Sequence, residues 1–301
     1  MTDPTHSGTT SADASTRANA TGDHAAPRAR VPILMYHSIS DVTSKVFAPF
    51  VIPPHEFAAQ IEYLASHGYT TLTLADLVRI RLSGSRLPPR PVVLTFDDAY
   101  ADFGETVAPL LLRHQFTASL YVTTGAVGRT NFWVKGDVPR RILTWDELRE
   151  IAATRVEIGA HSITHRAMDA LAAPDLHAEL ADPKAQLEDR LNQDVPTLAY
   201  PFGFESGRVR AAAAAAGYLA ACAVGYQMSA DGEDRFALSR LIVLPGMDLA
   251  AYGRLLDGRG PQWVQRARRV RSLAWRVVRR AAQVRTRGAS APLDTSLDKG
   301  D

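Results

Sequence analysis

The sequence predicts an α/β fold in which a parallel sheet closes into a barrel. Apolar runs of strand length alternate with amphipathic runs of helical length through most of the chain, and this alternation is typical of a parallel sheet. Polar clusters follow four of the strand-like runs, at positions 37, 97–98, 161 and 200–203. Because a barrel brings the carboxyl ends of its strands to one face, closure is favoured over an open sheet.

Eight segments have the composition of buried strands. They are residues 32–36, 69–72, 92–96, 117–122, 156–160, 197–200, 219–224 and 238–243. Seven segments have helical periodicity, namely residues 55–67, 74–82, 101–114, 144–153, 174–192, 206–216 and 249–256. Pro53 and Pro54 precede the first helix and Gly68 follows it, as expected of helix ends. Thr144 and Glu147 form a capping-box pattern.

The composition is that of a globular protein with unusual ends. The 301 residues are 46% hydrophobic and 22% charged, with a net charge of +2, which suits one large domain. Residues 2–30 contain no Val, Ile, Leu, Met, Phe, Trp or Tyr, so we expect residues 1–30 to be a disordered tail without a signal peptide. We expect residues 288–301 to be disordered too. Cys222 is the single cysteine and lies in an apolar run, so it predicts an inert buried thiol.

The catalytic domain should span residues 31–257, followed by a basic amphipathic helix over residues 258–287. Ten arginines lie between Arg259 and Arg287, with no acidic residue among them. This pattern is typical of a helix that binds an anionic membrane surface. An acidic glycan is an alternative partner, and nucleic acid is a poorer one. The structural alternative is a helix that packs on the barrel with its arginines in solvent. The expected location is cytoplasmic, peripheral to a membrane if the helix binds lipid, and no run is long enough to span a bilayer.

Two short motifs predict a metal-dependent hydrolase. The sequence TFDD at 95–98 and the sequence HSITH at 161–165 each follow an apolar strand. One carboxylate and two imidazoles can bind a divalent ion and leave coordination positions for water and substrate. Taken singly, an Asp pair is more often a turn or a helix cap, and paired histidines are often structural. Their joint occurrence at strand ends favours catalysis.

The two motifs resemble those of the polysaccharide deacetylases, also called the NodB-homology group or carbohydrate esterase family 4. The family motifs T-F-D-D and H-S-x-x-H are both matched, and the resemblance runs from about Val31 to Tyr252. It implies a distorted (β/α)7-type barrel that removes N-acetyl groups from an N-acetylated glycan. It also implies a divalent ion held by Asp98, His161 and His165. We expect zinc, with cobalt or nickel as alternatives.

The resemblance assigns Asp97 the role of general base on the attacking water. The alternative is that Asp97 is a further ligand or supports the ligands. In the family an arginine pairs with this base, but Ala199 occupies the matching position. Arg240, near the end of the last predicted strand, is our candidate for the missing arginine, and an ordinary surface arginine is the alternative.

The sequence YPFG at 200–203 resembles the family's third motif, commonly R-P-P-Y-G. Proline and glycine there favour a sharp turn that exposes backbone N–H groups. By alignment, the Phe202 amide would stabilise the oxyanion, and Tyr200 would lie in the same pocket.

A second departure from the family concerns the general acid. The family usually supplies a late histidine, but no histidine follows His177. The segment 31–37 resembles the opening of the subgroup that deacetylates poly-N-acetylglucosamine, in which the acid comes from the N-terminal side. We therefore expect His37 to protonate the leaving amine, with a purely structural histidine as the alternative.

Two other functions stay open at this point. The same fold and metal could cleave a small cyclic or linear amide or imide. A protein with a degenerate site could instead bind glycan or lipid without catalysis, since the family arginine and late histidine are missing. Trp133, in the loop at 125–141, would either stack on a sugar ring or pack in the core.

Overall fold

The structure is a computed structural model that describes residues 30–134 and 138–259. The strands are β1 (Arg30–Val31), β2 (Ile33–Tyr36), β3 (Ser38–Ile39), β4 (Val51–Ile52), β5 (Thr70–Leu72), β6 (Pro91–Phe96), β7 (Ala118–Val122), β8 (Val156–Ala160), β9 (Thr197–Ala199), β10 (Ala220–Cys222), β11 (Ser229–Ala230) and β12 (Leu241–Ile242). The helices are α1 (Pro54–Ser66), α2 (Leu74–Ser83), α3 (Ala108–Arg113), α4 (Trp145–Ala152), α5 (Ala173–Leu191), α6 (Gly207–Ala215) and α7 (Leu249–Leu256). Each of the eight predicted strands and seven periodic helices has a counterpart.

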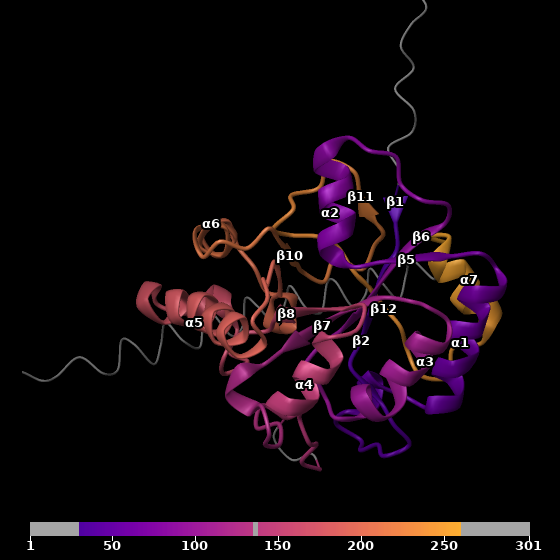
Figure 1. The fold of residues 1–301 in the computed structure, drawn as a ribbon, viewed down its shortest axis with the longest axis horizontal. Coiled ribbons are helices and arrows are strands. Elements are labelled where there is room, and N and C mark those ends of the chain that lie inside the picture. The colour runs from indigo at the N-terminus through magenta and orange to yellow at the C-terminus, as the bar shows by residue number, and fades with distance from the viewer. Residues whose placement is uncertain (1–29, 135–137, 260–301) are drawn as a thin grey trace, which may run out of the picture.

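The main sheet has eight strands, all paired in parallel. They run in the order β10-β9-β8-β7-β6-β2-β12, with β5 beside the first half of β6. A parallel bridge joins Cys222 in β10 to Leu238, and Leu241 in β12 pairs with Leu34 in β2. The segment from Leu238 to β12 therefore links both edges of the curled sheet (Figure 1). The predicted barrel is confirmed, in a distorted form.

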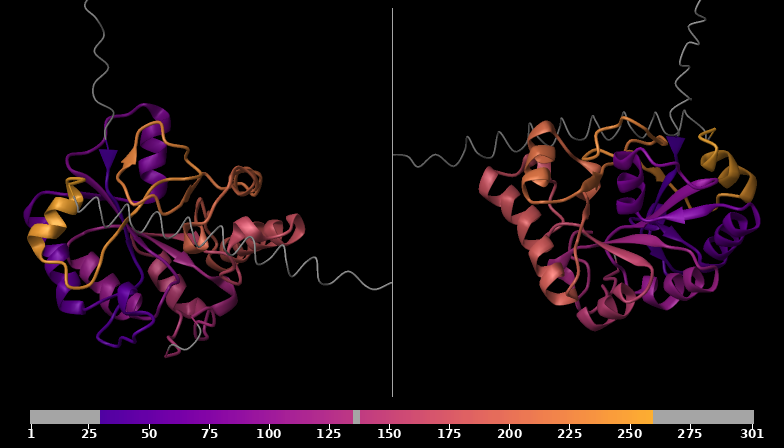
Figure 2. Two further views of the ribbon diagram at one scale, coloured as in Figure 1. Left: turned by 180° about the vertical axis from the view of Figure 1, so that it is seen from behind. Right: turned by 45° about the horizontal axis from the view of Figure 1, so that its top comes forward.

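Side chains alternate between the two faces of the sheet and form two cores. Outward residues such as Leu94 pack beneath the surrounding helices, whereas inward residues such as Val93 and Tyr121 form a smaller cluster inside the barrel. Leu74 and Leu77 of α2 belong to this inner cluster. Figures 1 and 2 show α2 close to β1 and β11, while α1, α3, α4 and α5 lie around the outside of the sheet.

Helix α2 closes the amino end of the barrel. Its first three backbone N–H groups donate to the side chains of Ser119 in β7, Glu157 in β8 and Thr73. These bonds satisfy groups that a helix start leaves without a partner. Because α2 covers the amino end, a substrate can approach the inner residues from the carboxyl end of the barrel.

Some elements differ from the prediction. The helix expected over residues 101–114 begins as a π-helical turn, Phe103–Val107, before α3, because Pro109 has no N–H group to donate to the preceding turn. The antiparallel pair β1–β11 and the parallel pair β3–β4 were not predicted, since two-residue strands carry no periodic signal.

The predicted tails and nearly all of the predicted basic helix lie outside the described residues, so their conformation and any lipid binding stay predictions. Among the residues that are described, no helix combines the length and the apolar character needed to cross a bilayer.

Candidate metal centre and active site

Strand alternation places three of the predicted site residues at the carboxyl end of the barrel. His37, Asp97 and His161 each come directly after the last residue of a strand, in β2, β6 and β8 respectively. Each is an even number of residues from inward-facing positions of its own strand, so its side chain points to the same inner face. The β2–β6 register pairs Tyr36 with Phe96, which sets His37 level with Asp97.

A left-handed turn brings the second aspartate to the same side. Consecutive residues of a strand point to opposite faces, but φ is +77° at Asp98 and +57° at Ala99. Non-glycine residues seldom adopt this region, because it costs about 1–3 kcal/mol each. The turn ends the alternation of side chains between the two faces of the sheet, so the carboxylates of Asp97 and Asp98 both lie at the mouth of the barrel.

Asp98, His161 and His165 form a cluster that fits a metal ion. Their ligand atoms all lie within 4.8 Å of one another, and the Asp98 Oδ1 atom is 3.5 Å from His161 Nε2 and 3.3 Å from His165 Nε2. Ligands at about 2.0–2.1 Å from a tetrahedral ion are separated by about 3.3 Å. Asp98 Oδ1 is buried and has no hydrogen-bond partner among the described residues, a costly state that a cation would relieve. The donor set therefore suits a divalent ion.

The two histidines are oriented in different ways. The Nδ1–H group of His161 donates to the Ala199 carbonyl at 2.7 Å, which leaves Nε2 as the lone-pair atom toward Asp98. Burial lowers the pKa of His161 to about 4, so the imidazole is neutral at pH 7, as a metal ligand must be. The His165 ring stacks on Trp133, with centroids 4.7 Å apart and planes at 14°, and meets the edge of Phe202.

Arg240 pairs with Asp97 inside the barrel. The guanidinium donates from Nη1 to Asp97 Oδ1 at 2.6 Å and from Nη2 to Oδ2 at 2.8 Å. Its Nε donates to the Ala223 carbonyl, Nη1 also reaches Thr95 Oγ1, and the Tyr121 ring lies beneath it. Arg240 is 0% exposed, so the surface-arginine alternative is wrong. Burial alone would raise the pKa of Asp97, but Arg240 outweighs it and holds that pKa below its ordinary value.

Replacing Arg240 with Met should destabilise the fold by about 3–5 kcal/mol, since it leaves the Asp97 carboxylate buried without its partner. Burial would then raise the pKa of Asp97, so the acidic limb of the kcat–pH profile should move to higher pH. Chemical denaturation and the pH profile measure the two effects. Arg240→Lys keeps the charge but not the two-pronged geometry, and it should lie between the wild type and Arg240→Met. An unchanged acidic limb in Arg240→Met would contradict the assigned pairing role.

His37 lies beside the Asp97–Arg240 pair. Its Nε2 atom is 4.0 Å from Asp97 Oδ2, its side chain is 15% exposed, and its ring packs on Phe50. Burial lowers the pKa of His37, and the nearby Asp97 carboxylate offsets only part of that effect. A partly exposed titratable nitrogen at the mouth of the barrel has the placement that a proton donor to substrate requires.

The turn at residues 200–203 contributes backbone and one aromatic ring. Phe202 has φ of +60° and is 48% exposed, so its ring forms part of the rim next to His165. Tyr200 is fully buried and its hydroxyl donates to the Phe236 carbonyl. The Tyr200 side chain therefore packs beneath the turn and does not line a pocket as predicted, because its hydroxyl has a partner in the opposite direction.

Glu179 of α5, which belongs to none of the predicted site motifs, binds the loop that carries His161 and His165. The Glu179 carboxylate accepts hydrogen bonds from the backbone of Ile163 and Thr164. A signal was available, since Glu179 lies on the same helix face as the buried residues Leu176, Leu180 and Leu187. A carboxylate on an apolar helix face must find donors when it is buried.

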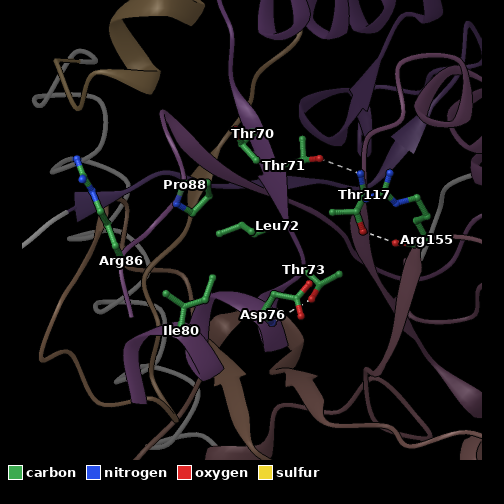
Figure 3. A pocket seen from close by; sticks show the side chains of 10 residues that line it. All are labelled: Thr70, Thr71, Leu72, Thr73, Asp76, Ile80, Arg86, Pro88, Thr117 and Arg155. Carbon is green, nitrogen blue, oxygen red and sulfur yellow. Dashed lines mark hydrogen bonds between the residues drawn. The ribbon is translucent and has the colours of Figure 1, made fainter. Parts of the chain in front are cut away.

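A large groove lies at the other end of the barrel. It has a volume of about 660 Å³ and is lined by β5, α2 and residues that precede β7 and β8 (Figure 3). Its Thr71 hydroxyl accepts a hydrogen bond from the Thr117 amide. Thr117 and Arg155 precede β7 and β8, whereas the predicted site residues follow their strands, so the groove is remote from those residues.

Comparisons with known proteins point to one family of enzymes. The family model described as polysaccharide deacetylase matches residues 84–221. YxkH of Bacillus subtilis (strain 168), whose description reads "Putative polysaccharide deacetylase", is 27% identical over 229 residues, 76% of this chain and 77% of that protein. A poly-β-1,6-N-acetyl-D-glucosamine N-deacetylase of Staphylococcus aureus (strain MSSA476) is 25% identical over 174 residues, 54% of this chain and 57% of that enzyme.

Solved structures share the fold. The Streptococcus pyogenes deacetylase PplD, in complex with acetate, superposes with a TM-score of 0.68 at 24% identity, covering 78% of this chain and 100% of that one. IcaB from Ammonifex degensii superposes with a TM-score of 0.64 at 20% identity, covering 77% and 98% respectively. The family model and the two motifs identify residues 84–221 as a polysaccharide deacetylase domain, and the solved structures show that the chain has the same fold.

Proposed function

We propose that the protein is a metal-dependent hydrolase that removes N-acetyl groups from the N-acetylated sugars of a polysaccharide. One observation carries the proposal, namely the buried Asp98–His161–His165 cluster beside the ion-paired Asp97 at the open end of the barrel. The name of the Staphylococcus aureus relative supports poly-β-1,6-N-acetyl-D-glucosamine as the first substrate to test.

Asp98, His161 and His165 are the proposed ligands of a divalent ion, and we propose zinc. One carboxylate and two neutral imidazoles are a common donor set for catalytic zinc. When bound, the ion would supply Lewis-acid chemistry, polarising the acetyl carbonyl and making water a better nucleophile.

Asp97 is the proposed general base. Its pKa is held low by Arg240, so it is ionised at neutral pH and can accept a proton from the attacking water. Arg240 donates to both carboxylate oxygens, which fixes the plane of the carboxylate and leaves one lone pair on each oxygen for the substrate side. This contact also removes one reason for the non-catalytic hypothesis, because Arg240 fills the role left open by Ala199.

His37 is the proposed general acid. As the carbon–nitrogen bond breaks, its Nε2–H would protonate the sugar amine, while the acetyl carbon keeps the oxygen from water and leaves as acetate. The lowered pKa of His37 makes its protonated form a stronger acid than an ordinary imidazolium but a less populated one at neutral pH, so amide cleavage should slow as the pH rises through that pKa. The Phe202 backbone N–H would donate to the negative charge that develops on the carbonyl oxygen.

Replacing His37 with Ala should slow amide cleavage by roughly 10²–10⁴-fold and leave metal content unchanged. An activated ester such as p-nitrophenyl acetate needs little protonation of its leaving group, so its hydrolysis should fall much less. The ratio of the two rates is the measurement. Equal losses on both substrates would show that His37 shapes the site instead of donating a proton.

Acetate release tests the function as a whole. Purified protein supplied with zinc, cobalt or nickel should release acetate from poly-N-acetylglucosamine or another N-acetylated glycan, and a chelator should stop the release. Turnover of small amides or imides without glycan activity would identify the amidohydrolase alternative. Bound metal without turnover of either class would support a binding protein.

A further inference from the structure

The loop that carries both histidine ligands has a strained conformation. In residues 161–165, φ is +67° at Ser162 and +54° at His165. Left-handed backbone is unfavourable for a residue that has a Cβ atom. In this conformation both Nε2 atoms lie within 3.5 Å of Asp98 Oδ1. Contacts from outside the loop must therefore stabilise it.

Glu179 of α5 supplies the charged part of that support. Its Oε2 atom accepts the Ile163 N–H at 2.8 Å and the Thr164 N–H at 2.9 Å. Its Oε1 atom accepts the Thr164 hydroxyl. Glu179 is only 4% exposed, so these bonds to a carboxylate form largely away from water, where they are strong.

The opposite side of the loop is held by backbone. The N–H groups of Thr124 and Gly125 donate to the carbonyls of Ser162 and Ile163, each at 3.1 Å. A Cβ atom at Gly125 would lie 2.4 Å from the Ile163 carbonyl oxygen, so the two segments are in close contact. The middle of the loop is therefore fixed between the Glu179 carboxylate and the chain that follows β7.

We propose that Glu179 is a positioning residue for the metal site, which fixes the turn between His161 and His165 and so sets the affinity for the ion. Glu179 does not reach Asp98 or the substrate side; it acts through the Ile163 and Thr164 amides. The inference rests on the proposed metal site, but it does not depend on the identity of the substrate.

The test compares Glu179→Gln with Glu188→Gln, a matched change on the same helix. The Glu188 carboxylate also accepts a backbone N–H group, from Val195 at 3.1 Å, but it has no contact with the ligand loop. A glutamine amide at 179 can offer only one acceptor oxygen. We expect the zinc dissociation constant of Glu179→Gln, measured by competition with a chelator, to rise about 10–100-fold, and that of Glu188→Gln to stay at the wild-type value.

The cobalt-loaded absorption spectrum gives a second readout, because it reports ligand geometry, and it should change in Glu179→Gln alone. Thermal unfolding of the metal-free proteins measures the purely structural effect of each change. Glu179→Asp keeps the charge with a shorter reach and serves if Glu179→Gln does not fold; its affinity should be lowered too. Wild-type zinc affinity and cobalt spectrum in the folded Glu179 variants would overturn the inference, whatever their loss of stability. That result would leave the proposed function intact, whereas metal binding without acetate release in the wild type would remove the function and leave the inference.

Discussion

Replacing Asp97 with Asn should lower kcat by roughly 10²–10⁴-fold, the usual contribution of a positioned base, while the metal content stays at the wild-type level. Asn is nearly the same size but cannot accept a proton near neutral pH. Asp97 is 3% exposed and its carboxylate faces Arg240 on one side and His37 on the other. Elemental analysis together with acetate release would check both halves. Loss of metal along with activity would identify Asp97 as a ligand.

The same variant needs a control for charge. An asparagine amide group would face one arm of the Arg240 guanidinium and leave its charge buried and uncompensated, which should reduce stability as well. The double variant Asp97→Asn with Arg240→Met removes this mismatch, so it should recover stability but not activity. Recovery of activity in the double variant would mean that the single change acts by displacing neighbours, and Asp97 would not be the base.

Most of the fold could be predicted because its signals are local. The inner strands are short apolar runs, and helix ends such as the Thr144–Glu147 capping box use residues close in sequence. The pairs β1–β11 and β3–β4 could not be predicted, because such short strands form only where tertiary packing brings them together. The position of α2 at the amino end of the barrel could not be predicted from its sequence either. Its apolar residues Leu74, Leu77 and Val78, which pack inside the barrel, would suit packing on the outside of the sheet equally well.

The metal ligands could be predicted because they belong to short motifs at strand ends. Contacts between distant segments were harder to predict. Asp98, His161 and His165 were identified from motif residues and meet in the structure as a cluster. The contact between Arg240 and Asp97 spans 143 residues, and it exists because the segment after Leu238 joins β10 to β2. The family resemblance made Arg240 a candidate for this contact, but the sequence left an ordinary surface arginine as the alternative, and only the fold decides between them. The stacking of Trp133 on His165 could not be predicted from the sequence either. The sequence left two roles open for Trp133, stacking on a sugar ring or packing in the core.

Of the substitutions proposed, His161→Ala should have the largest effect. The protein should lose both its bound metal and its acetate release. Two remaining protein ligands hold a divalent ion poorly. His161 is 1% exposed and neutral at pH 7, because burial lowers its pKa to about 4, so no proton competes for its Nε2 atom under ordinary conditions. Its Nδ1 bond to the Ala199 carbonyl fixes the ring in place before an ion arrives, which lowers the entropic cost of binding.

Elemental analysis and chelator competition measure the loss, and His177→Ala is the matched control, since His177 is an exposed histidine on α5. That control should keep wild-type metal content and activity. His165→Ala should behave like His161→Ala, because each removes one of the two imidazoles from the same cluster. Full metal occupancy in His161→Ala would remove that histidine from the ligand set. Asp98 and His165 would then be the remaining ligands of this cluster, and the ion would need a further donor. Asp97, which directly precedes Asp98 in the chain, would be the first carboxylate to test.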